Sequence, residues 1–262
     1  MPLLDHLEEF RKRIFWILGT LVVGTGVGFW IVVHFNVLAL LIRPVQEYLV
    51  GGKLKYLSPA DPFMVTLRLA VAVGVVVAVP VALYHLWAFI SPILVPSERK
   101  AILPAVYMTA FLFLAGASLA YFGVLPITLQ FFKTFEPGSL EQNLTVDKFL
   151  SYTMKLLLGF GIAFETPVIM LALSVVGIVN SEMLVRVRRF AIVIIFVLSA
   201  ALTPPDVFSQ MLMAVPLLLL YEVSIRLVRW QEGRREEAPG DEEEETDEPA
   251  QADAPTAGDP TE

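Results

Sequence analysis

Hydrophobic residues form long stretches that are separated by shorter polar segments. The 29 residues between Arg13 and Arg43 contain no Asp, Glu, Lys or Arg, and neither do the 32 residues between Lys100 and Lys133. An apolar run of about 18 residues or more is long enough to cross a bilayer as a helix. The pattern therefore predicts an all-α polytopic membrane protein.

Six transmembrane helices follow when the polar and proline-rich segments are taken as connections. A short interfacial helix is expected over residues 38–48, where apolar and polar positions alternate. Residues 126–150 are expected to form a polar loop and residues 177–189 a basic connection. The predicted spans cover about 14–34, 63–88, 101–125, 151–176, 190–203 and 207–224.

The last two predicted spans are short. Sixteen residues separate Arg189 from Asp206, and 15 separate Asp206 from Glu222. At a rise of about 1.5 Å per residue they reach about 22–24 Å, against a hydrocarbon core of about 30 Å. Such helices either thin the bilayer locally or lie among longer helices.

Basic residues indicate the orientation of the chain. With six spans the two termini share one side, which carries 12 lysines and arginines against seven on the other side. Because basic loops favour the cytoplasmic face, both termini are expected in the cytoplasm. The first apolar stretch is interpreted as a retained span, since no cleavage site for a signal peptide stands out.

Composition and charge divide the chain into two parts. Hydrophobic residues make up 56% of the chain and charged residues 17%, with a mean hydropathy of +0.69. These values exclude a soluble enzyme or a nucleic-acid-binding domain as a description of the whole chain. Residues 226–262 hold 13 acids and 4 arginines, so the net charge of −7 reflects the tail. We expect a six-span domain over 1–230 and a disordered acidic cytoplasmic tail over 231–262.

Signatures of catalysis and metal binding are missing from the sequence. The chain has no cysteine, no phosphate-binding GxxxxGK[ST] loop and no HExxH motif. Its three histidines are scattered. No catalytic residue, metal site or cofactor is therefore predicted.

Two acidic residues are expected at the cytoplasmic mouths of the first and third spans. Glu9 precedes the basic Arg11, Lys12 and Arg13, and Glu98 is expected in the first turn of the third helix, with Ser97 as its N-cap. Helix dipoles and local ion pairs, Glu8 with Lys12 and Glu9 with Arg13, would explain these acids structurally. The functional interpretation is that the two carboxylates converge on one cationic ligand.

Glu165 is the most unusual single residue. It follows Lys155 by ten residues, which places it about 15 Å into the membrane core. An ionisable side chain at that depth indicates a functional site. The structural alternative is a neutral carboxylic acid that is hydrogen-bonded to the carbonyl of Ala163, which Pro167 leaves without a donor.

Two other features have simple structural explanations. Gly24 and Gly28 are spaced as in closely packed membrane helices, and ordinary helix packing is the expected role. Asp206 follows two prolines and is expected to cap the last span.

Four motifs together resemble the TatC family, the multispanning subunit of the twin-arginine protein translocase. The likeness covers roughly residues 3–226, with the same order of six spans and the same two short final spans. The motifs are His6–Arg13 before the first span, Trp87–Pro92 with Glu98-Arg99 after the second, Phe164–Pro167 in the fourth, and Leu202–Gln210 between the last two.

The resemblance implies a function that the residues alone do not. It implies a multi-pass protein of the cytoplasmic (inner) membrane that is not an enzyme and binds twin-arginine signal peptides of folded cargo. Together with single-span TatA- and TatB-type partners in an oligomeric complex, it would drive transport with the proton-motive force. No cofactor or nucleic acid is implied.

The resemblance also assigns roles to residues by their positions in the motifs. Signal-peptide binding falls to Glu9, Glu98, Arg11, Phe89 and Arg99. Contact with a partner helix inside the membrane falls to Glu165, and functions at the outer face fall to Pro44 and Asp206. The acidic tail matches none of these motifs.

A proton-coupled secondary transporter is the alternative function, with Glu165 as the proton relay. Such a transporter predicts a second charge at the midplane or a pair of broken helices near Glu165. The sequence offers neither outright.

Overall fold

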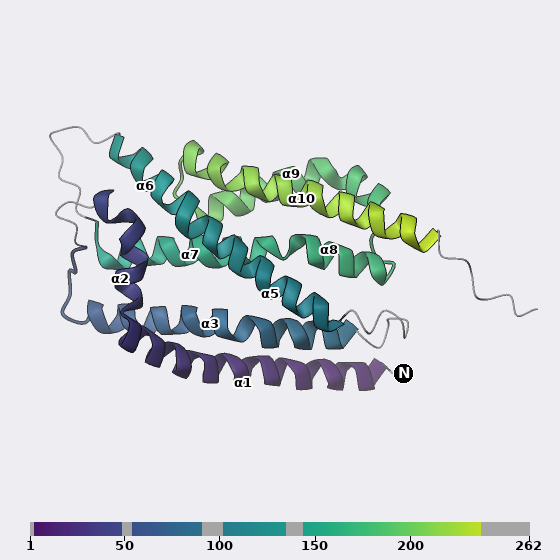
Figure 1. Ribbon diagram of the computed structural model, residues 1–262, viewed down its shortest axis with the longest axis horizontal. Helices are drawn as coiled ribbons and strands as arrows, with labels where there is room; N and C mark the ends of the chain where they lie inside the picture. Colours follow the sequence, from purple (N-terminus) through teal and green to yellow (C-terminus); the bar gives the residue numbers. More distant parts are fainter. Residues whose placement is uncertain (1–2, 49–53, 91–101, 135–143, 237–262) are drawn as a thin grey trace, which may run out of the picture.

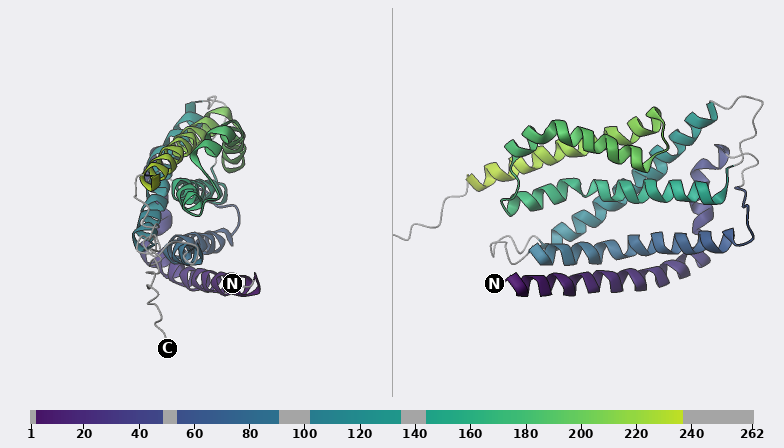
Figure 2. Two further views of the ribbon diagram at one scale, coloured as in Figure 1. Left: turned by 90° about the vertical axis from the view of Figure 1, so that its right-hand side faces the viewer. Right: turned by 180° about the vertical axis from the view of Figure 1, so that it is seen from behind.

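The computed structural model describes residues 3–48, 54–90, 102–134 and 144–236. These residues are almost entirely helical, with one isolated bridge between Lys55 and Thr145, so the all-α prediction is confirmed for them. The described chain begins and ends at the same end of an elongated bundle (Figures 1 and 2). We call this the terminal end and the other the loop end.

The chain runs back and forth along the bundle in successive helices (Figure 1). Between α1 and α3, the chain turns across the loop end in two short helices, where a single short helix was expected over residues 38–48. The helices are α1 (Leu3–Phe35), α2 (Val37–Ile42), η1 (Arg43–Tyr48), α3 (Asp61–Ile90), α5 (Ile102–Leu119), the π-helix η4 (Ala120–Val124), α6 (Leu125–Thr134), α7 (Val146–Phe164), α8 (Thr166–Val175), α9 (Ser181–Leu202) and α10 (Val207–Glu236).

Five helical stretches of the described chain are long and apolar enough to cross a membrane. They correspond to the first four predicted spans and the sixth. The predicted fifth span lies in α9, whose first half carries three arginines and which is not among the five. In the fold, α9 runs alongside α10, and their connecting turn stops short of the loop end that α6 and α7 reach (Figures 1 and 2).

The third helical stretch is longer than the sequence predicts. The expected polar loop begins at residue 126, but α6 continues to Thr134. The π-helix η4 interrupts the regular hydrogen-bond pattern directly before α6. Pro126 therefore lies at the start of a new helical segment, where its missing N–H disrupts least.

The last two helices also extend beyond the predicted spans. Asn180 caps α9, because its side-chain oxygen accepts a hydrogen bond of 2.7 Å from the Met183 N–H, and so α9 begins at Ser181 rather than near 190. Helix α10 continues to Glu236, past the expected end of the folded domain at residue 230. Gln231 accepts a bond from the Ser174 hydroxyl (3.1 Å) and Glu232 one from the Ser181 N–H (2.9 Å). These contacts hold residues that the sequence assigns to a disordered tail.

Glycines bring α1 and α3 into direct backbone contact. A Cβ added at Gly74 would lie 2.6 Å from the Thr25 nitrogen, and one at Gly24 would lie 2.8 Å from the Gly74 oxygen. One at Gly28 would overlap the Ala70 carbonyl oxygen. The expected role of the Gly24 and Gly28 pair in helix packing is confirmed.

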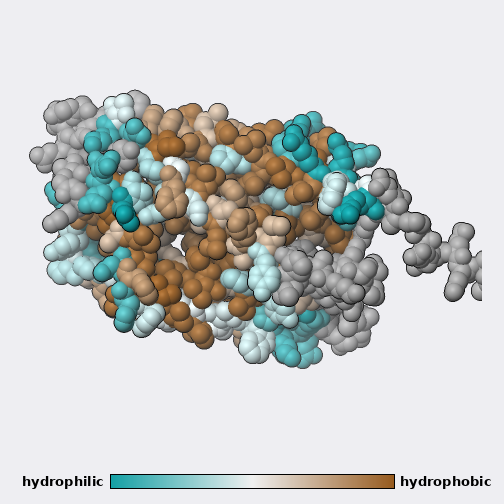
Figure 3. Space-filling model, in the orientation of Figure 1, coloured by the Kyte–Doolittle hydropathy of each residue, from teal (hydrophilic) through white to brown (hydrophobic). Residues whose placement is uncertain are grey.

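The larger hydrophobic core lies among η4, α6, α7, α9 and α10, with Phe149, Phe160 and Met213 among its fully buried side chains. A smaller cluster joins α1, α2, α3 and α7 around Leu69 and Leu150. On the face shown in Figure 3, hydrophobic side chains cover the middle of the molecule and hydrophilic ones gather toward its two ends. This distribution is that of a protein whose middle faces lipid.

Candidate functional site

The first turns of α1 carry one group of the charged residues at the terminal end. Glu9 forms an ion pair with Arg13, and the Arg13 guanidinium also donates a bond of 3.0 Å to the His85 carbonyl of α3. The expected Glu9–Arg13 pair is therefore present. Glu8 lies 3.8 Å from Arg11 rather than pairing with Lys12, and the side chains of Glu8 and Arg11 are about three-quarters exposed.

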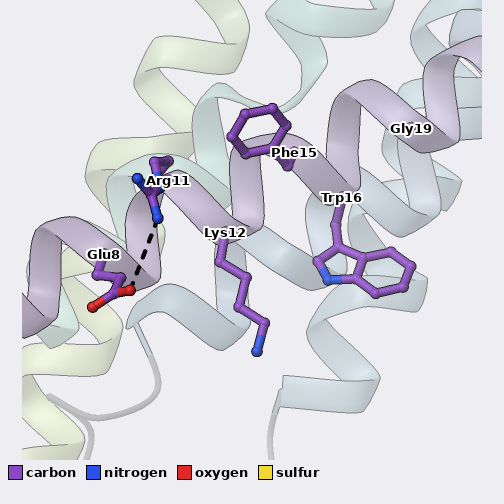
Figure 4. A pocket seen from close by; sticks show the side chains of 6 residues that line it. All are labelled: Glu8, Arg11, Lys12, Phe15, Trp16 and Gly19. Atoms are coloured by element: carbon purple, nitrogen blue, oxygen red, sulfur yellow. Dashed lines mark ion pairs between the residues drawn. The ribbon is translucent and has the colours of Figure 1, made fainter.

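An open hollow of about 490 Å³ runs along this face of α1. Figure 4 shows Glu8, Arg11 and Lys12 at one end and two aromatic side chains, Phe15 and Trp16, at the other. The Trp16 ring stacks on the His85 ring of α3, with centroids 6.3 Å apart. The hollow thus combines one carboxylate, that of Glu8, with aromatic rings, the two kinds of group that hold a guanidinium ion, whereas Glu9 does not line it.

The remaining residues of the predicted peptide site lie at or beyond the limits of the described chain. Phe89 lies in the last turn of α3, four residues after His85, so its backbone is level with the first turns of the antiparallel α1. Its side chain, Glu98 and Arg99 lie outside what the structure describes. The structure therefore places Glu9 and Arg11 in the same part of α1, where Arg11 lines the hollow and Glu9 pairs with Arg13, and the other three remain predictions.

Glu165 lies in the break between α7 and α8. Its backbone carbonyl accepts bonds from the Val168 and Ile169 nitrogens, which starts α8. Its side chain is only 5% exposed, and neither carboxyl oxygen has a hydrogen-bond partner. The bond to a helix carbonyl that the structural alternative required is therefore not formed, and a buried polar group without a partner is destabilising.

An apolar groove of about 490 Å³ passes this break. Ala163 and Thr166, on either side of Glu165, line one wall of the groove, and α9 and α10 supply the other. Glu165 itself does not line it. A helix lying in this groove would contact the residues around Glu165 before it reached the carboxyl group.

Asp206 lies in the turn between α9 and α10, on the side of the loop end but short of it, and starts α10. Its Oδ1 accepts a bond of 2.7 Å from the Ser209 N–H, so the predicted capping role is confirmed. Its Oδ2 is buried without a partner. Three further buried hydroxyl oxygens, on α7, α9 and α10, also have none within the described chain: those of Thr153, Ser199 and Ser209.

Pro44 lies in η1 at the loop end. The neighbouring Val45 is fully buried, and η1 packs against α6, where the Lys133 ammonium donates to the Glu47 carbonyl (3.3 Å). The other side of α6 meets α10, because the Phe131 and Phe208 rings stack 3.8 Å apart. Helix α6 thus separates the two residues assigned to the outer face.

Sequence reasoning did not single out His85 or the buried hydroxyl groups of α7, α9 and α10. His85 acts through its backbone carbonyl, which no side-chain pattern signals. The serines and threonines lie within apolar stretches, where they are unremarkable in sequence. Among the described residues, no group of three or more His, Cys, Asp or Glu side chains could hold a metal ion.

Comparisons with known proteins place this geometry in context. Residues 5–216 match the family described as TatC, Sec-independent protein translocase protein. The chain is 39% identical to TatC of Aquifex aeolicus, over 87% of this chain and 94% of that protein. It is 38% identical to TatC of Carboxydothermus hydrogenoformans, over 88% and 93%. A crystal structure of the twin arginine translocase receptor TatC superposes with a TM-score of 0.77 at 38% identity, covering 86% of this chain and 98% of that one.

Proposed function

Because this chain belongs to the TatC family of Sec-independent protein translocase proteins, we propose that it binds the twin-arginine signal peptides of folded cargo at its terminal end. Proteins of this family are components of a protein translocase and are not enzymes. Together with TatA- and TatB-type single-span proteins, the chain would drive export with the proton-motive force. The observation that carries the proposal is the terminal part of α1, with the Glu8 carboxylate and the aromatic rings of the hollow beside the Glu9–Arg13 pair.

Glu9 is suited to receive one arginine of the peptide. Arg13 holds its Oε1 from one side, which fixes the carboxylate and leaves Oε2 for a second donor. A guanidinium presents parallel N–H groups to a carboxylate, whereas lysine presents a point charge. Glu98 is proposed to take the other arginine, with Arg11, Phe89 and Arg99 supporting the surface.

Peptide titration in detergent tests this site. Each charge-assisted contact contributes about 1–3 kcal/mol, so Glu9→Gln with Glu98→Gln should weaken binding by roughly one to three orders of magnitude. A twin-lysine peptide should bind weakly to the unchanged protein. The exposed Glu47→Gln at the loop end is a matched control and should leave affinity unchanged. Unchanged affinity in the double variant would refute the site, whereas loss of expression would favour a purely structural role.

The orientation proposed here puts the terminal end in the cytoplasm. The shared position of the two ends of the described chain supports six crossings, with α9 as the fifth. The arginines near the start of α9 and the end of α10 agree with a cytoplasmic location. Reporter tags before residue 5 and after 230 should both be cytoplasmic, and a cytoplasmic tag at Gly138 would contradict six spans.

Glu165 is proposed to contact the membrane helix of a partner. Its two unpartnered oxygens can bond to a polar side chain that enters from the apolar groove. Pro44 and Asp206 are proposed to act at the outer face, on opposite sides of α6. Membership of a translocase family favours this function over that of a proton-coupled transporter. A transporter would be favoured by a second intramembrane charge near Glu165, which the sequence does not offer outright.

A further inference from the structure

The terminal ends of α9 and α10 carry arginines that form no ion pair within the described chain. Arg186 and Arg189 lie on α9 and Arg226, Arg229 and Arg234 on α10; all five are exposed, and none forms an ion pair with a described residue. We call these five residues the arginine surface. Arg189 and Arg234 lie over the rings of Phe190 and Trp230.

The acids on these two helices do not balance this charge. Glu222 is paired with Arg188, and Glu232 accepts the Ser181 N–H. Glu182 is exposed and has no ion pair within the described chain. The Arg188–Glu222 pair joins α9 to α10, and Arg226 and Arg229 follow Glu222 by four and seven residues, so they share its face of α10. Positive charge without ion-pair partners is therefore concentrated around the Arg188–Glu222 pair, where α9 and α10 meet near the terminal end.

The chain continues from this surface into its most acidic segment. Residues 237–262 contain 11 acids and no base, and seven of the eight residues in Asp241–Glu248 are acidic. We propose that the segment Asp241–Glu248 folds back and binds the arginine surface. The inference rests on charge and chain length and does not depend on the proposed peptide site.

The length of the connection permits this contact. Arg226 lies ten residues before the last residue of α10, or about 15 Å along the helix. Asp241 follows that last residue by five residues, which span at most about 17 Å when extended. The acidic segment can therefore begin to contact the arginines at its first residue. Because both partners belong to one chain, their effective concentration is in the millimolar range.

Exposed ion pairs are weak singly and are screened by salt, with a Debye length of about 8 Å at physiological ionic strength and about 3 Å at 1 M. The contact should therefore depend on several pairs together and disappear at high salt. Anionic lipid headgroups are the competing occupant of the surface. The test has to distinguish these two.

Intramolecular crosslinking is a direct test, because the chain has no cysteine of its own. One cysteine replaces the exposed Val185, which lies beside Arg186 and Arg189 on α9 (Val185→Cys). The other replaces Thr246, the one uncharged residue of the acidic segment (Thr246→Cys). A short bis-maleimide should join them in the otherwise unchanged full-length protein at about 50 mM NaCl. We expect at least a threefold lower yield in 1 M NaCl, where the pairs are screened.

The control variant keeps the tail length and removes its charge. Replacing Glu242, Glu243, Glu244 and Glu245 by Gln should lower the crosslinking yield as much as salt does, and Arg226→Gln with Arg229→Gln should lower it in part. An equal yield in the charged and neutral tails at low salt would overturn the proposal. So would a crosslink that forms in phosphatidylcholine nanodiscs but is lost in phosphatidylglycerol nanodiscs, since lipid headgroups would then hold the surface.

Discussion

The two halves of the bundle solve the problem of packing in a membrane in different ways. Helices α1 and α3 run as continuous helices, and small residues let their backbones touch. Helices α7 and α8 are separated by a break at Glu165 and α9 is shorter, and together with α10 these helices enclose polar atoms without partners, including both oxygens of Glu165. Among the described residues, α1 and α3 have no buried polar atom of this kind, whereas α7 to α10 combine part of the larger hydrophobic core with several of them.

This difference suggests a division of labour. Close backbone packing stabilises helices in lipid, where no hydrophobic force drives them together. Unpartnered buried polar groups are destabilising and in native proteins often mark a place where a ligand, water or partner completes the structure. We therefore expect substitutions in the α1–α3 pair to change mainly stability, and substitutions in α7 to α10 to separate stability from function.

Gly28→Ala should have the largest effect on stability. The new Cβ would overlap the Ala70 carbonyl, so α1 and α3 would have to move apart, at a cost of about 3 kcal/mol. Gly26→Ala on the same helix meets nothing within 4 Å and is the matched control. Melting in detergent should show a clear loss for the first variant and none for the second; equal melting temperatures would mean that the glycine contact is dispensable.

Glu165→Leu should raise stability while it lowers function. Removing two unpartnered buried oxygens should stabilise the protein by about 1–3 kcal/mol. The same change should reduce co-purification of a TatA- or TatB-type partner, and Glu165→Gln should retain much of it, because an amide still forms hydrogen bonds. Partner recovery that is equal in the Leu and Gln variants would leave Glu165 without a role in partner contact.

Asp206 allows capping to be separated from a functional role. Asp206→Ala removes the bond to the Ser209 N–H and should cost about 1 kcal/mol. Asp206→Asn keeps an equally good cap and should melt near the unchanged protein. If transport assays follow melting in both variants, the cap is its whole role; lost transport in the Asn variant alone would indicate a role for the charge.

Arg68→Gln should have the smallest effect. Arg68 of α3 pairs with Asp147 of α7 at the loop end, and both side chains are about half exposed. Such a pair contributes about 0.2–1 kcal/mol. The shift in melting temperature should be small and should shrink further in high salt, and a large shift would show that this pair, rather than the apolar cluster, joins the two halves.

The order of the helices along the chain was predictable from hydropathy, because apolar stretches of membrane length have few alternatives to a helix. The ends of helices were less predictable. Asn180 was not recognised as a cap, and the π-helix before Pro126 allows a helix where a loop was expected. The last turns of α10 consist of polar and charged residues, which in the sequence resemble a tail. Their contacts with Ser174 and Ser181 hold them against the bundle as part of the helix.

The candidate site divides in the same way. The Glu9–Arg13 pair follows from helical spacing, which the sequence displays directly. The link from Arg13 to the His85 carbonyl joins residues 72 positions apart, and no local pattern signals it. The depth of Glu165 was evident from its distance to Lys155, but its lack of partners depends on how four helices meet.

Arg13 also couples peptide binding in the proposed receptor to the contact between α1 and α3. One guanidinium holds both the Glu9 carboxylate and the carbonyl of α3, so a peptide arginine that competes for Glu9 necessarily changes how firmly α1 is tied to α3. Linkage is reciprocal: whatever the peptide does to the α1–α3 contact, that contact does equally to the affinity for the peptide. Occupancy at the mouth of the first helix would thus be transmitted into the bundle as a change in the rigidity of its most tightly packed pair.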